Sequence, residues 1–287
     1  LRTGRRTPKG VTGYDLTALL TGSEGTLAVT LEATLRLRRK PEQIFTTMAL
    51  FADVEGAVAA VSTVLASGLG PRCLEMTDGT CVGLMRDEGL ALDPRAGAML
   101  IVEVDGDVAR CEADLERLGG ELDSAGAMTV LVAQDEAQRA RLWATRSELS
   151  NIVRRLAKSK IAEDVVVQRR DLPALVQLVN AISERTGLKM LSYGHAGDGN
   201  LHVNVLWDDD EELPRVERAL DELFRAVIAL GGTLSGEHGI GSSKAAYLRL
   251  EQTSELIELQ RSIKGVFDPA GILNPGKIFP RGGHGAC

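Results

Sequence analysis

The run Ala98-Met99-Leu100-Ile101-Val102-Glu103-Val104 is strand-like, and the turn pair Asp105-Gly106 closes it. An apolar run of this length bounded by turn residues is typical of a buried strand. A helix is expected over residues 107–118, ending at Gly119-Gly120, and residues 128–132 read as the next strand. This part of the sequence therefore predicts one strand–helix–strand unit.

A similar unit precedes it. Residues 45–51 are strand-like, and Asp53 can cap a helix that runs to Ser67 and stops at Gly68. Another strand is expected near residues 72–75. Two such units in succession predict an antiparallel sheet with helices on one face, a ferredoxin-like α+β layer.

The rest of the sequence alternates in the same way. Towards the C-terminus it predicts a helix over residues 135–158, a strand over 164–167, a helix over 172–186, a hairpin of 188–193 with 201–206, a helix over 211–230 and one or two helices within 243–266. Towards the N-terminus, a Gly-rich turn at 22–25 precedes a strand over 26–37, and Lys40-Pro41 marks a domain border.

The composition is that of an ordinary globular protein. The 287 residues are 44% hydrophobic and 25% charged, enough for one large domain or two smaller ones. The net charge of −7 argues against a phosphate-backbone binder, so no nucleic-acid partner is expected. No apolar run reaches the roughly 18–20 residues that span a bilayer. The four cysteines have no CxxC spacing and no secretory signal is present, so reduced thiols in a cytoplasmic protein are expected.

Two histidines lie in one glycine-rich stretch, Ser192-Tyr193-Gly194-His195-Ala196-Gly197-Asp198-Gly199-Asn200-Leu201-His202-Val203-Asn204. Two strand-like segments flank a turn rich in glycine, aspartate and asparagine, a composition that is typical of a β-hairpin. A spacing of seven would place His195 and His202 on opposite faces of a single strand. Folded as a hairpin, the same spacing can bring them beside each other. Asn204, two residues beyond His202, lies on the same strand face.

A second stretch, residues 231–241, holds Glu237-His238 between glycines, where the backbone can approach a ligand closely. His195, His202 and Glu237 form the two-histidine, one-carboxylate set of many catalytic divalent-metal sites, with Zn²⁺ or Mn²⁺ as the expected ion. The alternative is that the histidines only hold loop backbones through hydrogen bonds. Their clustering favours the metal site.

The helix expected over residues 135–158 carries Arg146, with Ser150 one turn later on the same face. A guanidinium can bind a carboxylate with two parallel hydrogen bonds, so Arg146 is a candidate anchor for an acidic substrate. In isolation, an arginine on a helix is more often solvated at the surface.

Several segments, in order along the chain, resemble the FAD-linked oxidase family with a vanillyl-alcohol-oxidase-like flavin domain. Members include D-lactate dehydrogenases, the flavin subunit of glycolate oxidase and D-2-hydroxyglutarate dehydrogenase. The matching residues are Thr12-Gly13-Tyr14-Asp15-Leu16, Gly22-Ser23-Glu24-Gly25-Thr26-Leu27, the stretch 195–204, Ser235-Gly236-Glu237-His238-Gly239-Ile240-Gly241, and residues 267–269 with 274–277.

The resemblance implies an FAD cofactor and a division of the chain into three parts. Residues 1–40 would be the C-terminal remnant of the FAD-binding domain, 41–267 the substrate or cap domain, and 268–287 a tail that returns to the FAD domain. The flavin contacts implied by the resemblance are Gly22, Ser23, Gly25, Thr26 and Asn274.

The sequence also departs from the family. The upstream phosphate-binding loop has no counterpart and Leu1 is not an initiator methionine, so we expect either that the chain is part of a longer protein or that the missing FAD-binding half is supplied elsewhere. Ala28 stands where a glycine is common in the flavin turn. Ala162 replaces a substrate-contacting lysine of some hydroxyglutarate enzymes, with Lys160 nearby, so a second carboxylate-binding site is not expected.

Together these features predict FAD-dependent, metal-assisted oxidation of a 2-hydroxyacid, with the D configuration implied by the resemblance alone. His238 would remove the hydroxyl proton, Asn204 would orient the substrate, and Arg146 with Ser150 would bind its carboxylate. The expected partners are the small substrate and an electron acceptor of open identity, with a homodimer as one possible assembly. Alkyl transfer or phenol oxidation on the same fold, and an inactive truncated module, are the alternatives.

Overall fold

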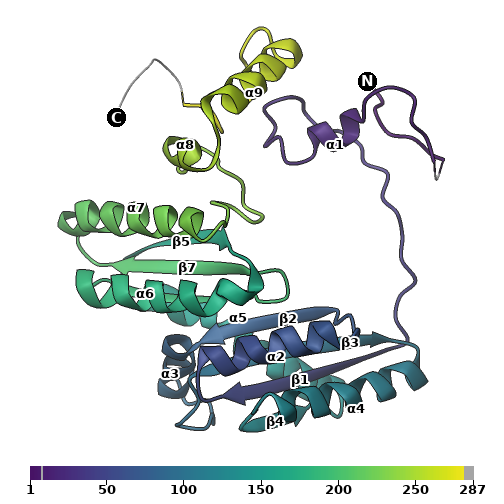
Figure 1. The fold of residues 1–287 in the computed structure, drawn as a ribbon, viewed down its shortest axis with the longest axis vertical. Helices are drawn as coiled ribbons and strands as arrows, with labels where there is room; N and C mark the ends of the chain where they lie inside the picture. Colours follow the sequence, from purple (N-terminus) through teal and green to yellow (C-terminus); the bar gives the residue numbers. More distant parts are fainter. Residues whose placement is uncertain (8, 281–287) are drawn as a thin grey trace. The chain divides into compact units, whose positions relative to one another are not determined.

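The computed structural model describes residues 1–7 and 9–280, and the chain divides into two compact units. The sheet unit comprises Lys40–Gly236, and the terminal unit combines Leu1–Arg39 with the segment that begins at Glu237 (Figure 1). This segment begins before residue 268, where the sequence predicted the start of the C-terminal tail. Residues 281–287 of the predicted tail lie outside the described part. Within the described residues, none of the helices has the length and apolar character that a bilayer crossing requires.

The sheet unit is built on a seven-stranded sheet in the order β4-β1-β3-β2-β6-β7-β5, and every neighbouring pair is antiparallel. The first four strands, in the order β4-β1-β3-β2, have the predicted ferredoxin-like arrangement. The α+β class and the antiparallel sheet are therefore confirmed. The strands are β1 (Gln43–Phe51), β2 (Cys73–Asp78), β3 (Ala98–Gly106), β4 (Thr129–Val132), β5 (Ser159–Val166), β6 (Lys189–His195) and β7 (Asn200–Trp207).

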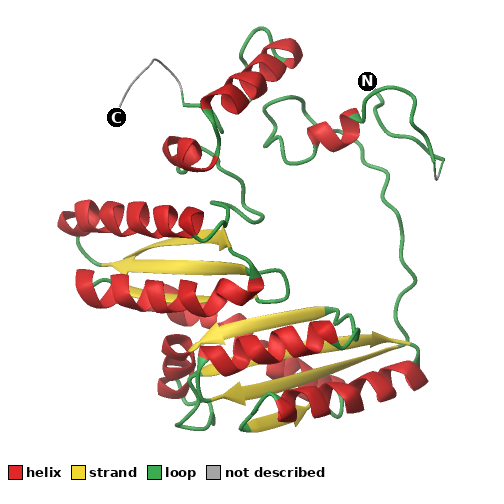
Figure 2. Cartoon of the chain, viewed as in Figure 1, coloured by secondary structure: helices red, strands yellow, loops and turns green. Residues whose placement is uncertain are grey.

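Helices cover both faces of this sheet, not one face (Figure 2). Helices α2, α4 and α6 lie on one face, with α7 packed against α6, while α3 and α5 lie on the other. The helices are α2 (Val54–Ala66), α3 (Gly79–Asp87), α4 (Val108–Ser124), α5 (Glu136–Arg155), α6 (Leu172–Thr186) and α7 (Leu213–Ala229), with short 3₁₀ turns η1 (Arg169–Asp171) and η2 (Asp210–Glu212). The face under α3 and α5, here called the α5 face, carries Met48, Ile101, Tyr193 and Leu206.

Two-sided burial explains why the central strands read as continuous apolar runs. Seven consecutive residues of β3, from Ala98 to Val104, are buried. Continuous burial needs a cover on both faces, whereas a strand with one solvated face alternates apolar and polar residues. The second cover includes α3, which the sequence did not predict. Its N-cap Asp78 accepts a hydrogen bond from Cys81 N at 2.8 Å.

The described part of the terminal unit contains helices but no strand. These are α1 (Leu16–Leu20), η3 (Ala245–Tyr247), α8 (Leu248–Glu251) and α9 (Ser254–Phe267). The strand predicted over residues 26–37 is wrong, because residues 28–37 form no regular structure. The described part of this unit contains no strand with which they could form a ladder, and an isolated strand leaves its backbone groups unpaired.

Candidate functional site

The β6–β7 hairpin places two imidazoles side by side on the α5 face. Tyr193 of β6 is the register partner of His202 of β7, and His195 lies two residues beyond Tyr193. The rings of His195 and His202 are therefore diagonal neighbours, with centroids 5.4 Å apart and planes at 85°. The hairpin spacing predicted this juxtaposition.

The turn that joins the two histidine-bearing strands depends on glycine at two positions. A Cβ at Gly194 would lie 2.6 Å from the carbonyl oxygen of Asn200 across the hairpin. Gly199 has φ of +81°, and a Cβ there would lie 2.0 Å from the carbonyl oxygen of Val167. A side chain at Gly194 would push β6 and β7 apart, so this glycine sets the spacing of the imidazoles, whereas Gly199 allows the turn to pack against Val167.

A buried glutamate lies behind the first imidazole. Glu75 of β2 is the register partner of His195, and its Oε1 contacts His195 Nδ1. Its Oε2 accepts a hydrogen bond from Nε of Arg146 on α5 at 3.2 Å, and the Nη2 of the same guanidinium forms an ion pair with it at 3.1 Å. Sequence reasoning did not identify Glu75. The signal that could have found it is a carboxylate between Leu74 and Met76 in a strand-like run.

Arg146 is not the solvated surface arginine of the alternative interpretation. Its side chain is only 14% exposed. Its guanidinium carbon lies 4.4 Å from the centre of the Tyr193 ring, a cation–π contact with the sheet. Ser150, one turn further along α5, is half-buried. The predicted anchor therefore lies against the same sheet face as the two histidines.

Asn204 and Lys160 extend the polar cluster along the same face. Asn204 is fully buried, donates from Nδ2 to the carbonyl of His202 at 3.2 Å, and accepts from Lys160 Nζ at 3.3 Å. Burial, and then the charge of Arg154, lower the pKa of Lys160. Ala162 is the register partner of Asn204, so its position and that of Lys160 share this face.

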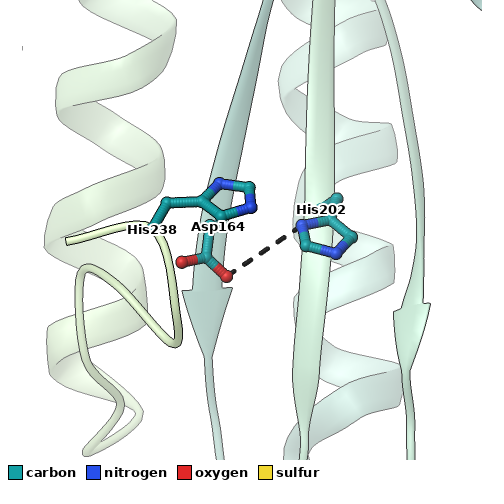
Figure 3. Close-up of side chains that lie close together, drawn as sticks. All are labelled: Asp164, His202 and His238. Atoms are coloured by element: carbon teal, nitrogen blue, oxygen red, sulfur yellow. Dashed lines mark ion pairs between the residues drawn. The ribbon is translucent and has the colours of Figure 1, made fainter. Parts of the chain in front are cut away.

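A second buried carboxylate, Asp164 of β5, faces the second imidazole. It is the register partner of His202, and its Oδ1 lies 4.0 Å from His202 Nδ1 (Figure 3). It also accepts from Asn200 Nδ2 at 2.6 Å and from Ser235 Oγ at 3.0 Å, while its backbone carbonyl accepts from Gly236 N at 3.3 Å. Asp164, which sequence reasoning also missed, thus fixes the segment that ends the sheet unit.

Glu237 and His238 begin the second segment of the terminal unit. Their side chains are 52% and 55% exposed, and His238 Nε2 lies 3.6 Å from Glu237 Oε1. Figure 3 also draws His238. Glu237 is peptide-bonded to Gly236, so the hydrogen bond from Gly236 to β5 fixes where this pair leaves the sheet unit.

The terminal unit has a cavity of about 450 Å³ at the predicted flavin turn. Gly22, Ser23, Gly25 and Asn274 all line it, although Asn274 is 250 residues from its hydrogen-bond partner, the Glu24 carbonyl. The volume falls in the range of small-molecule sites. Four of the five predicted flavin contacts thus meet at one cavity.

The fifth predicted flavin contact, Thr26, is buried and donates a hydrogen bond from Oγ1 to the carbonyl of Ser23 at 2.7 Å. The carboxylate of Glu24 accepts from the backbone N–H groups of Ile240 and Gly241 at 2.7 and 2.8 Å. Gly25 has φ of +67°, and a Cβ there would lie 2.6 Å from Asn274 Nδ2. Alanine at this position would therefore adopt a strained left-handed backbone and would require the Asn274 amide to shift.

Comparison with known proteins gives consistent results. Residues 40–278 match the family model described as FAD linked oxidases, C-terminal domain. The chain is 37% identical over 284 residues to glycolate oxidase subunit GlcD of Bacillus subtilis, covering 98% of this chain and 60% of that protein. It is 31% identical over 291 residues to D-lactate dehydrogenase of Anaerostipes hadrus, covering 97% of this chain and 61% of that protein.

A solved structure of alkyldihydroxyacetonephosphate synthase superposes with a TM-score of 0.66 at 17% identity, covering 94% of this chain and 51% of that one. At this identity the likeness shows the fold alone. The chain spans about 60% of the length of the two relatives above.

Proposed function

The chain belongs to the FAD linked oxidases, whose C-terminal domain it carries, and on that premise we propose that it is the substrate-handling part of a flavoenzyme that oxidises a 2-hydroxyacid to the 2-oxoacid. The observation that carries the proposal is the gathering of paired imidazoles and a buried arginine on one sheet face. Two of the similar proteins are named for glycolate and D-lactate, which are both 2-hydroxyacids.

The donor set fits a divalent cation. Two imidazoles bound to one tetrahedral ion at the usual Zn–N distance of about 2.1 Å have ring centres roughly 5 Å apart. The rings of His195 and His202 have centroids 5.4 Å apart, and the contact of His195 Nδ1 with Glu75 leaves its Nε2 as the ligand atom. We propose Glu237 as the third ligand, supported by its place directly after the anchored Gly236.

The chain's own residues divide the work on the substrate. Arg146 binds the carboxylate, with Ser150 one turn further along the helix, because a guanidinium fork matches the two carboxylate oxygens. Asn204 orients the substrate, and His238 removes the proton from the 2-hydroxyl as general base. When bound, the cation would supply Lewis-acid chemistry and FAD would accept the C2 hydride.

The terminal unit supports the flavin part of the proposal. Gly22, Ser23 and Gly25 line the cavity, and the two glycines leave the backbone there open to close approach of a cofactor. Asn274 reaches the same cavity from the other end of the chain. We propose that these residues and Thr26 hold FAD.

Anaerobic reduction of the flavin tests the proposal directly. The holoenzyme that contains this chain should lose its flavin absorbance on mixing with a D-2-hydroxyacid. His238→Ala should slow this reduction by about 10²–10⁴-fold, the usual contribution of a general base, and should keep its metal. His195→Ala should instead lose the metal. Unchanged reduction kinetics in His238→Ala, or stoichiometric metal in His195→Ala, would contradict the corresponding role.

The same experiment separates the alternatives. A flavoprotein for alkyl transfer or phenol oxidation would keep its absorbance in the presence of every 2-hydroxyacid. A preparation without flavin absorbance would favour an inactive module.

A further inference from the structure

We infer that Glu75 is a positioning residue shared by the two halves of the substrate site, fixing the metal-binding histidine with one oxygen and the carboxylate anchor with the other. The inference rests on the proposed function of His195 and Arg146. It adds a residue that connects them.

Each oxygen of Glu75 has a separate partner. Oε1 contacts His195 Nδ1, while Oε2 accepts a hydrogen bond from Nε of Arg146 and forms an ion pair with its Nη2. Glu75 is 7% exposed, so few other partners can reach it. A buried carboxylate with both oxygens occupied resists rotation, because turning it would leave polar groups unpaired.

The first contact selects a tautomer of His195. A carboxylate is only an acceptor, so His195 Nδ1 must carry the proton that it donates to Glu75. The lone pair of the neutral ring then lies on Nε2, the atom left for a cation. Carboxylates behind metal-binding histidines act in this way in many proteins.

The second contact orients the arginine before substrate arrives. The hydrogen bond to Glu75 uses the single N–H of Nε, and Nη2 forms an ion pair with the same oxygen, so the four N–H groups of Nη1 and Nη2 remain for other acceptors. Tyr193 lies under the plane of the guanidinium. An anchor held from two sides needs little ordering when the substrate carboxylate binds.

Glu103 provides a matched control. It is a buried glutamate of the neighbouring strand β3, it also pairs with an arginine of α5, Arg139, at 2.9 Å, and it accepts from Trp143 Nε1 at 2.7 Å. The described structure gives it no contact with a histidine. Glu103→Gln therefore measures the effect of weakening a buried glutamate–arginine pair without touching His195.

The test uses the full-length protein that contains this chain, labelled with ¹⁵N-histidine. In Glu75→Gln, Arg146 requires the amide oxygen, which turns the amide NH₂ group towards His195 Nδ1. The ring should then move its proton to Nε2, visible in multiple-bond ¹H–¹⁵N spectra, and Zn²⁺ affinity should fall about 10–100-fold. Glu103→Gln should keep both the tautomer and the affinity.

Glu75→Asp extends the test if Glu75→Gln does not fold. It keeps the charge but is too short to hold both partners, so we expect a loss of Zn²⁺ affinity in the same direction. An Nδ1–H tautomer and wild-type Zn²⁺ affinity in either Glu75 variant would overturn the inference. The tautomer is read without metal, so it reports on Glu75 even if His195→Ala were to retain Zn²⁺ and refute the proposed metal site.

Discussion

Replacing Gly199 by alanine should destabilise the sheet unit far more than the same change at Gly126. Both glycines have nearly the same left-handed backbone, with φ of +81° and +85°. Alanine at either position therefore carries the same cost of about 1–2 kcal/mol. Their surroundings differ, because a Cβ at Gly199 would lie 2.0 Å from the carbonyl oxygen of Val167, while nothing lies within 4 Å of a Cβ at Gly126.

The close approach adds two costs at Gly199. The buried Val167 donates its N–H to the Gly199 carbonyl at 3.1 Å, so separating the two strands weakens a hydrogen bond worth about 0.5–1.5 kcal/mol. Relieving an overpacked contact costs about 1–3 kcal/mol more. We expect the free energy of unfolding to fall by about 3–6 kcal/mol in Gly199→Ala and by about 1–2 kcal/mol in Gly126→Ala.

Urea unfolding followed by tryptophan fluorescence measures this difference. The two tryptophans of the chain, Trp143 on α5 and Trp207 on β7, both belong to the sheet unit, so their emission reports on that unit alone. Linear extrapolation then gives the free energy of unfolding of each variant. Equal losses in the two variants, within about 0.5 kcal/mol, would refute the idea that backbone approach requires glycine at position 199.

Three further outcomes follow from the structure. In the holoenzyme, Arg146→Lys keeps the positive charge but loses the planar guanidinium that contacts Glu75, so kcat/KM for a 2-hydroxyacid should fall about 10–100-fold. An unchanged kcat/KM in steady-state kinetics would contradict this expectation. Gly25→Ala should weaken FAD binding at least about tenfold in a flavin titration, because a Cβ would collide with the Asn274 amide. Gly13→Ala is the control, since Gly13 has a similar φ of +74° but open space around it, and its FAD binding should not change. Burial and neighbouring carboxylates raise the pKa of Cys73 from 9.0 to about 12. This shift stabilises the folded state below pH 9.0, and the stabilisation is lost as the pH rises towards 12. Iodoacetamide at pH 8 should therefore modify Cys73 about a thousandfold more slowly in the folded than in the unfolded chain, and mass spectrometry finding equal rates would contradict this.

Local patterns predicted most of the fold because each depends on residues close in sequence. The strand at β3, the Asp53 cap of α2 and the β6–β7 hairpin all follow from short-range chemistry. The hairpin also predicted the pairing of His195 with His202, because a tight turn converts a spacing of seven into a lateral contact.

The sequence could not reveal relations that depend on the order of strands in the sheet. Glu75 meets His195 across 120 residues, and Asp164 faces His202 from an edge strand, so neither contact has a local signal. The reverse error occurred at residues 26–37, where the local sequence predicted a strand but gave no information about a neighbouring strand, and residues 28–37 form no regular structure. A segment is stable as a strand only when the backbone of a neighbouring strand pairs with it.

The extended segment 28–37 has a consequence for handling the protein. Val29, Leu31, Leu35 and Leu37 are between 69% and 89% exposed and alternate with polar residues. Such a ribbon is a template for self-association, and it invites aggregation when the chain is produced alone. The arginines and lysine that follow Leu37 act as gatekeepers whose mutual repulsion opposes stacking, so added salt should promote precipitation by screening them.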